Sequence, residues 1–176
     1  MKRLSAKFDV KFNWLRRIFF IFYFLIFALV IVNPLNAKEV GPFNSNLKNY
    51  NVKLQILNKD KKQIAEFATA IADDNDKRKV GLMNLSSLPK NNAMLFIFEE
   101  SQVIEMWMKN TVIPLDMLFI DKNNVITKIV TNTTPFSLVM ISSKNPVNRV
   151  LEINAGLSDK LGIKVGQEMK VALLNY

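Results

Sequence analysis

Hydrophobic and polar residues alternate along several short stretches of this chain, which is typical of strands with one buried face. The first clear case is Val52, Leu54 and Ile56, which alternate with polar side chains. A polar turn at residues 58–62 follows, and residues 63–72 continue as a second strand. We therefore predict a β-hairpin at the start of the folded part of the chain.

The next stretch combines a short helix with the most apolar strand. Asp73 or Asp74 can cap a helix over residues 75–83, because their side chains accept hydrogen bonds from the first helical N–H groups. Residues 93–98 are apolar throughout. This pattern predicts a central strand that is covered on both faces.

The remainder of the chain shows further strand patterns and one more helix. A short helix is expected near residues 158–161, with Gly162 as its C-terminal stop. Further strands are expected at residues 102–108, 115–120, 125–131, 138–141, 149–153 and 168–174.

These elements predict a single α+β domain, mostly β, over residues 51–176. About eight strands and two short helices, joined mostly as sequential hairpins, favour a curved antiparallel sheet or a small barrel. The chain has 176 residues, 49% of them hydrophobic, which is enough for a hydrophobic core. Residues 38–50 lack periodicity and are rich in Asn, Gly and Pro, so we interpret them as a linker.

The amino-terminal segment, residues 1–37, has the layout of a secretory signal peptide. It holds six basic residues and one acidic residue, so +5 of the formal net charge of +9 lies there. Residues 18–32 carry no charge, and Pro34 and Ala37 supply a helix breaker and a small residue for cleavage. Such a helix spans about 22 Å, less than the roughly 30 Å of a bilayer core, which favours a cleaved signal over a permanent span.

A signal peptide at the amino terminus predicts an extracytoplasmic protein of the bacterial envelope, either periplasmic or secreted. We expect the mature chain to begin at or near Lys38. If cleavage fails, residues 18–32 act as a signal anchor that tethers the domain to the inner membrane, with the basic end in the cytoplasm.

The segment from Trp107 to Asp116 is the candidate functional site. A short polar insert lies between two apolar runs there, so its polar side chains gather at one end of two strands. Within residues 103–108, alternation places Met106 and Met108 on one face and Trp107 on the other. The predicted ligand-binding residues are Trp107, Lys109, Asn110, Thr111, Asp116, Arg78 and Asn154.

Asp116 is the residue on which the possible chemistry depends. It shares a strand face with apolar residues, so its carboxylate must be hydrogen-bonded or paired, and the nearest candidates are Lys109, Asn110 and Thr111. One hypothesis makes the protein a small hydrolase or lyase in which Asp116 acts as acid or base with Lys109. The other treats these polar groups as structural cross-links beside the pocket of a binding or accessory module, which the residues favour.

The composition limits which metals and partners are plausible. The chain has no histidine and no cysteine, which removes Ser-His-Asp and Cys-His catalysis and most zinc sites. We therefore predict no metal and no cofactor. An alternative is an envelope copper(I) protein that binds through the thioethers of Met106 and Met108, with Met94 and Met117 nearby.

The expected partner is an unknown small molecule or an envelope protein. Basic residues outside the leader alternate with acidic ones and are not interleaved with aromatic residues, so nucleic-acid binding is not expected.

A family resemblance covers about residues 62–171. The segments that carry it are residues 81–83, 88–89, 94–96, 107–111, 113–116, 151–152, 155–156 and 161–166. On these segments the chain resembles the family called domain of unknown function 192, which implies a compact β-rich domain and no agreed reaction. Leu85 and Ala93 depart from the pattern, where arginine and glycine are common in the family.

Overall fold

The structure is a computed structural model that describes residue 50 and residues 52–173. The expected signal segment, and all but Tyr50 of the expected linker, lie outside these residues. Within them, neither helix is long and apolar enough to cross a membrane.

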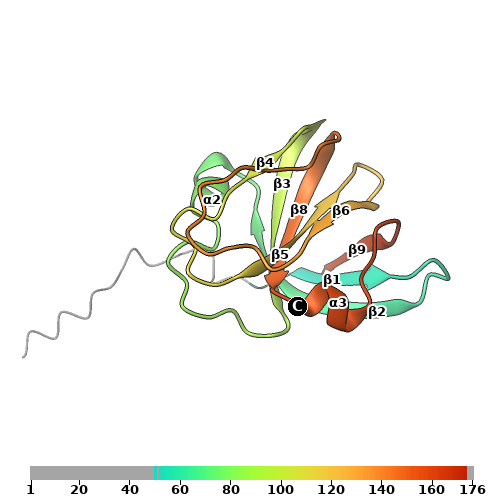
Figure 1. The fold of residues 1–176 in the computed structure, drawn as a ribbon. Helices are drawn as coiled ribbons and strands as arrows, with labels where there is room; N and C mark the ends of the chain where they lie inside the picture. The colour runs from blue at the N-terminus through green and yellow to red at the C-terminus, as the bar shows by residue number, and fades with distance from the viewer. Residues whose placement is uncertain (1–49, 51, 174–176) are drawn as a thin grey trace, which may run out of the picture. The chain divides into compact units, whose positions relative to one another are not determined.

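The described residues form nine strands and two short helices (Figure 1). The strands are β1 (Val52–Leu57), β2 (Gln63–Ala72), β3 (Asn92–Gln102), β4 (Glu105–Met106), β5 (Leu115–Ile120), β6 (Ile126–Val130), β7 (Ile141–Ser142), β8 (Val147–Asn154) and β9 (Glu168–Leu173). The helices are α2 (Asn75–Val80) and α3 (Leu157–Leu161).

The predicted hairpin of β1 and β2 is confirmed. The two strands pair antiparallel, with Leu54 opposite Phe67, and both side chains are buried. The side chain of Asn58 accepts hydrogen bonds from the main-chain N–H groups of Asp60 and Lys62, which closes the turn.

Seven strands form one mixed sheet in the order β6-β5-β8-β3-β2-β1-β9, and β4 pairs with β7 in a separate ribbon. All neighbours in the large sheet are antiparallel except β2 and β3, which are parallel. The prediction of an antiparallel sheet is therefore wrong at this pair. The reason is that α2 and the segment after it carry the chain back to the starting end of β2 before β3 begins.

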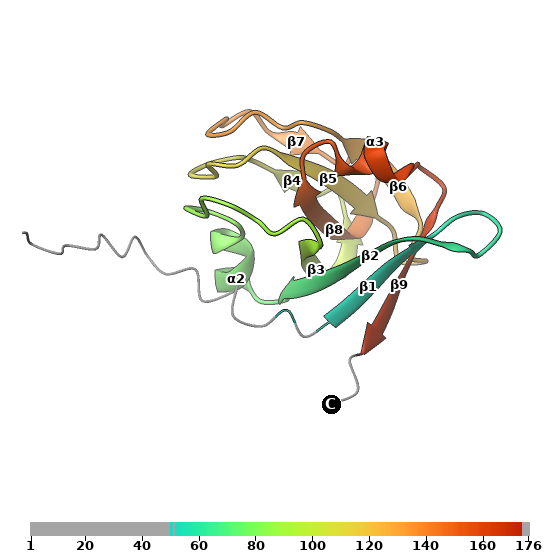
Figure 2. The same ribbon diagram turned by 90° about the horizontal axis from the view of Figure 1, so that it is seen from below.

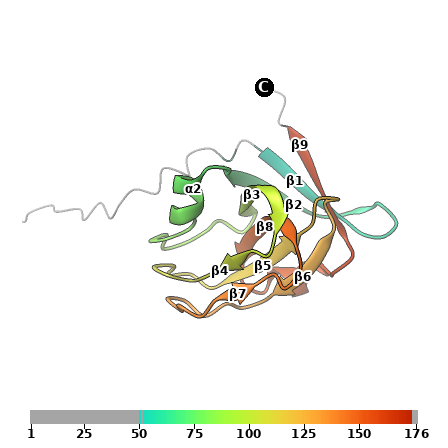
Figure 3. The same cartoon turned by 90° about the horizontal axis from the view of Figure 1, so that it is seen from above.

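The sheet is strongly curled, so its two edge strands meet at one end as a half-barrel (Figures 2 and 3). Val125, just before β6, forms a bridge with Glu168 of β9. The N–H of Ile126 donates to the carbonyl of Gln167 at 2.9 Å, and the N–H of Met169 donates to that of Asn124 at 2.8 Å. The predicted curved sheet is confirmed in this form.

Two groups of apolar side chains cover the two faces of the central strands. Leu95 of β3 belongs to the first group, which also contains side chains of β1, β2 and β9 and packs against α3. Met94 and Phe96 of the same strand belong to the second group, which lies beneath β4 and the loops around it. All six residues of β5 are buried. The predicted double coverage of residues 93–98 is thus confirmed.

Three predicted elements are shorter than expected. The helix expected to reach residue 83 ends at Val80, because Gly81 adopts φ +46° and ψ −130°. Of the strand expected at residues 138–141, only Ile141 pairs, in β7. The strand expected over residues 102–108 is reduced to β4, although its exposure still alternates as predicted. The second helix and its stop at Gly162 are confirmed.

Candidate functional site

A pocket of about 340 Å³ lies between α2, the middle of β3, β4 and β8. Its size falls in the range of about 300–1,000 Å³ that is usual for small-molecule sites. The residues that line it are Asn75, Arg78, Lys79, Val80, Gly81, Leu82, Met83, Phe96, Phe98, Glu105, Met106, Trp107, Thr111, Met140 and Glu152.

Glu152 supplies the enclosed polar group of this pocket. It lies in β8, between Met94 of β3 and Met117 of β5, which are its partners in the adjacent strands. Only 4% of the residue is exposed, and among the described residues no side-chain hydrogen bond or ion pair reaches its carboxylate, which lines the cavity. Burial raises the pKa of Glu152 from its ordinary 4.5 to about 8. The pocket therefore holds an unpaired acid that is protonated near neutral pH.

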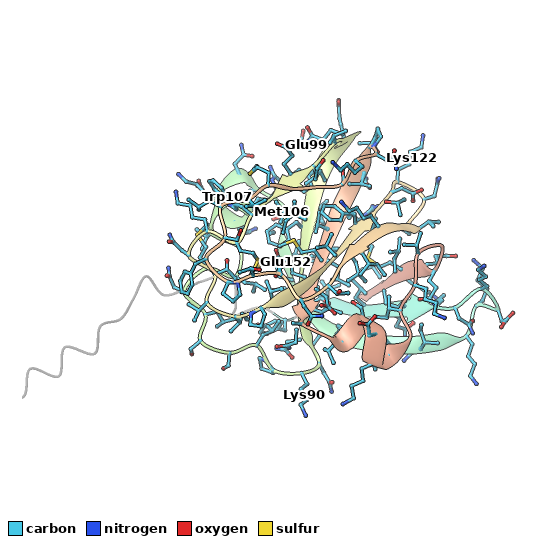
Figure 4. All side chains as sticks on the ribbon, in the orientation of Figure 1. Lys90, Glu99, Met106, Trp107, Lys122 and Glu152 are labelled. Atoms are coloured by element: carbon cyan, nitrogen blue, oxygen red, sulfur yellow. The ribbon has the colours of Figure 1, made fainter. Side chains whose placement is uncertain are left out.

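Methionine side chains line the same pocket as this acid. Met83 and Met140 line the pocket together with Met106, which is half-buried in β4. Figure 4 places Met106, Trp107 and Glu152 in the part of the molecule next to α2, away from Lys90 and Lys122. Thioether side chains are flexible and polarizable, so this lining can adapt to the shape of a bound molecule.

Arg78 of α2 lines the pocket, and its side chain is held in place by several contacts. Nη1 donates to the carbonyl oxygens of Asp73 at 2.8 Å and Ile97 at 2.7 Å, and Nη2 donates to Oδ1 of Asn75 at 2.6 Å. The guanidinium carbon also lies 5.1 Å from the centre of the Phe98 ring. Arg78 therefore joins α2 to the middle of β3 and stacks on a ring of the pocket wall.

Trp107 lies at the mouth of the pocket, where 41% of the residue is exposed. The Nζ of Lys109 lies 5.1 Å from the centre of its ring. The adjoining loops expose several large apolar side chains, which is uncommon for a surface without a partner. These side chains are Val112, Phe136, Leu138, Val139 and Met140.

Asp116 is enclosed on the other face of the sheet from Glu152. It has no exposed surface, and its Oδ1 accepts hydrogen bonds from the N–H groups of Asn132 at 2.9 Å and Gly156 at 3.0 Å. Its Oδ2 accepts from the N–H of Ser158 at 2.9 Å. These partners are main-chain groups, so the expectation that Lys109, Asn110 or Thr111 would satisfy Asp116 is wrong. The carboxylate thus connects β5 by hydrogen bonds to two segments that are distant in the chain, one at Asn132 and one at Gly156 to Ser158.

The other predicted site residues divide into two groups. Thr111 lines the pocket and is nearly buried. Asn110 adopts φ +54°, and its carbonyl accepts from the N–H of Asn84 at 2.8 Å, so it shapes a turn. Asn154 donates from Nδ2 to the carbonyl oxygens of Leu88 and Pro89 at 3.0 and 3.2 Å. The structure therefore brings Arg78, Trp107 and Thr111 to the pocket and places Asp116, Asn110 and Asn154 in connecting roles.

Sequence reasoning did not select Glu152 as a site residue. The signal was present, because a carboxylate between Leu151 and Ile153 in an apolar run raises the same question that Asp116 raised. Phe96 and Phe98 were also missed, since each reads as an ordinary core residue of the central strand.

A second, larger pocket of about 570 Å³ lies between the β1–β2 hairpin and α3. Its carboxylate, Glu66, is exposed and already engaged by Nζ of Lys53 at 2.9 Å and by Nε2 of Gln55 at 3.0 Å. We regard the Glu152 pocket as the better candidate, because its acid is enclosed and unpaired.

The fold and the pocket define a curled β-domain with a small-molecule-sized cavity under its β4–β7 ribbon. The family model described as uncharacterized ACR, domain of unknown function 192, matches residues 56–171, so the chain belongs to this family. The resemblance inferred from the sequence is confirmed.

Two solved structures are similar to the chain. One is a protein from Sinorhizobium meliloti 1021, described only as a candidate transcription regulator. It is 36% identical, with a TM-score of 0.67, and the match covers 70% of this chain and 95% of that one. The other is a protein of unknown function from Novosphingobium aromaticivorans, 29% identical, with a TM-score of 0.64 and coverage of 67% and 83%. No curated protein matches the chain.

Proposed function

We propose that this domain is an extracytoplasmic binding module that holds a small molecule in the Glu152 pocket. The observation that carries the proposal is the Glu152 carboxyl group, which is enclosed, lacks a protein partner in the described part of the chain and lines a cavity. A ligand gives this group the partner that the protein does not provide.

An enclosed carboxyl group without a partner is costly in a purely structural role. Enclosing a carboxyl group without a hydrogen bond costs on the order of 1–3 kcal/mol, and more if it is ionised. A leucine of similar size between Met94 and Met117 would avoid this cost. An acid that destabilises the fold and faces a cavity is typical of a functional site.

The hydrolase or lyase hypothesis receives less support from the geometry. Asp116 uses both carboxylate oxygens on main-chain donors and is fully enclosed, which leaves it no access to a substrate. Lys109 stacks on Trp107 at the pocket mouth. We therefore assign Asp116 a structural role.

The copper(I) hypothesis is also less well supported than an organic ligand. Met106 lines the pocket, but Met108 is fully buried in the core. The pocket volume is also about ten times the roughly 30 Å³ that one water molecule occupies in the liquid, so it far exceeds a bare ion. The hypothesis predicts copper(I) uptake that disappears when Met106→Leu is combined with Met108→Leu.

The proposed location rests on the basic, then apolar, amino-terminal segment. Amino-terminal sequencing of the exported protein tests it, and the expected first residue is at or near Lys38. Recovery of the intact chain from the cytosol would contradict an extracytoplasmic role.

The binding function can be tested by separating stability from binding. Glu152→Leu should raise the free energy of unfolding, because it removes an unpaired buried acid, and should abolish retention of small molecules by the purified chain. Glu99→Gln, an exposed change at the far end of β3, is the control and should alter neither property. Small molecules released from each denatured protein are measured by mass spectrometry. Loss of stability with unchanged retention in Glu152→Leu would show that the acid is structural.

A further inference from the structure

We infer that the pocket takes an organic cation whose ammonium group docks against the carboxylate of Glu152. This inference rests on the proposed binding function and adds the chemical class of the ligand. It is carried by the arrangement of one enclosed acid among thioethers and aromatic rings.

Glu152 has no partner for its carboxyl group among the described residues. The side chains of its strand neighbours Met94 and Met117 offer no proton donors, and none of the described residues forms an ion pair with it. An enclosed carboxylate needs donors or a positive charge to be stable in its ionised form. An ammonium group supplies both, because it carries three N–H donors and a full charge.

The pocket wall contains three aromatic rings. Phe96, Phe98 and Trp107 line the cavity, and the faces of aromatic rings attract cations. Two of these rings already do so within the protein, because Arg78 lies over Phe98 and Lys109 lies over Trp107, each 5.1 Å from the ring centre. The wall is therefore suited to surround a positive group.

Three other charged groups line the pocket. Arg78 and Lys79 approach from α2, and Glu105 approaches from β4. The guanidinium of Arg78 is directed to main-chain carbonyls and to Phe98. Lys79 is exposed and therefore screened by solvent. Glu105 adds a second acid at the solvent side of the pocket. The enclosed end thus carries the charge of Glu152 alone.

The cavity is large enough, and apolar enough, for the carbon skeleton of an organic cation. A volume of about 340 Å³ accommodates an organic molecule, and the thioethers of Met83, Met106 and Met140 provide an adaptable apolar wall for its carbon skeleton. A linear alkylammonium ion is therefore a suitable probe.

Binding of a cation is linked to proton release at Glu152. In the empty pocket the group holds its proton up to a pH of about 8, and an ammonium ion favours the ionised form. The affinity for a cation should therefore rise about tenfold per pH unit below that value and level off above it. A carboxylate ligand, which needs the protonated acid, should bind equally well at pH values below about 8 and more weakly above that value.

The experiment compares hexylammonium, 1-hexanol and hexanoate as probes of the full-length chain at pH 6, 7 and 8.5. Binding is followed by NMR of ¹³C-labelled methionine methyl groups, which report on Met83, Met106 and Met140. Hexylammonium should bind best of the three at pH 8.5 and about tenfold more weakly at pH 6 than at pH 7. Glu152→Gln should weaken it at least tenfold at pH 8.5 and remove the pH dependence, whereas Glu99→Gln should change neither.

The outcomes distinguish the inference from the proposed function. Preferential binding of hexanoate or hexanol at the pocket methyl groups overturns the cation inference and leaves a binding module in place. If no probe shifts these methyl signals, both proposals are overturned. Should Glu152→Gln fold poorly, Glu152→Leu provides the same comparison, and retained pH-dependent binding in either variant refutes the role of Glu152.

Discussion

Replacing Asp116 with asparagine should destabilise the fold strongly, because this carboxylate joins three separate parts of the chain. Oδ1 accepts from the N–H groups of Asn132 and Gly156, and Oδ2 accepts from that of Ser158. An asparagine side chain keeps one acceptor oxygen. In its best orientation it retains the first two bonds and turns its NH₂ group toward the N–H of Ser158.

The magnitude follows from these contacts. A hydrogen bond to a charged group contributes about 1.5–3 kcal/mol, and an enclosed N–H left without a partner costs about 1–3 kcal/mol. The two retained bonds also weaken, since their acceptor is no longer charged. We therefore expect Asp116→Asn to lower the free energy of unfolding by roughly 3–5 kcal/mol, a large share of the 5–15 kcal/mol of a typical domain.

Urea unfolding of the purified chain, followed by far-ultraviolet circular dichroism, measures this loss. With a denaturant slope of about 1–3 kcal/mol/M, the midpoint should fall by at least about 1 M. Asp121→Asn is the matched control, because Asp121 accepts both of its bonds, from Asn123 and Val125, on a single oxygen that asparagine retains. Its effect should stay below about 1 kcal/mol. A loss below about 1 kcal/mol for Asp116→Asn would refute the structural role assigned to this carboxylate.

Two further substitutions test the pocket wall and the pocket acid. Gly81→Ala should destabilise the domain by roughly 2–4 kcal/mol in urea unfolding, because φ is +46° and the new Cβ would lie 3.0 Å from the ring of Phe96. The control Gly162→Ala, at φ +67° with open space around it, should cost only about 1–2 kcal/mol. Equal losses in the two variants would exclude a contribution from the contact with Phe96. The stability of the wild type should fall by roughly 3–6 kcal/mol between pH 4.5 and about 8, because the unfolded chain releases the Glu152 proton before the folded protein does. Glu152→Gln should remove this part of the pH dependence, and an unchanged pH profile in that variant would contradict the assignment.

The hydrophobic pattern of the sequence predicted single strands and hairpins better than it predicted which distant strands pair. The alternation of Val52, Leu54 and Ile56 was sufficient for the first hairpin, because a turn and its two strands are neighbours in the chain. The parallel pairing of β2 with β3 depends on the path of the connection between them, which no periodicity records. The strand expected at residues 138–141 failed because apolar residues there are exposed in a loop.

The candidate site was only partly predicted, because the sequence records local patterns but not contacts between distant segments. Trp107 and Thr111 were found because polar and apolar residues meet abruptly at the end of a strand. Asp116 was correctly expected to need hydrogen-bond partners, but those partners come from residues 132–158, and distant main-chain groups leave no mark in a sequence. Glu152 stands in an apolar run that marks it as an unusual carboxylate, but its place in a pocket could not be predicted, because strands β3 and β5 pair with it from elsewhere in the chain.

Titration of the Glu152 side chain by ¹³C NMR tests the central claim most directly. Labelled glutamate carboxyl signals are followed from pH 3 to 10 in the ligand-free chain, and Glu152→Gln identifies the signal that belongs to this residue. We predict a midpoint near pH 8, because the acid is enclosed and unpaired. A midpoint near 4.5 would mean that the carboxyl group is hydrated or already paired, and would contradict the pocket described here.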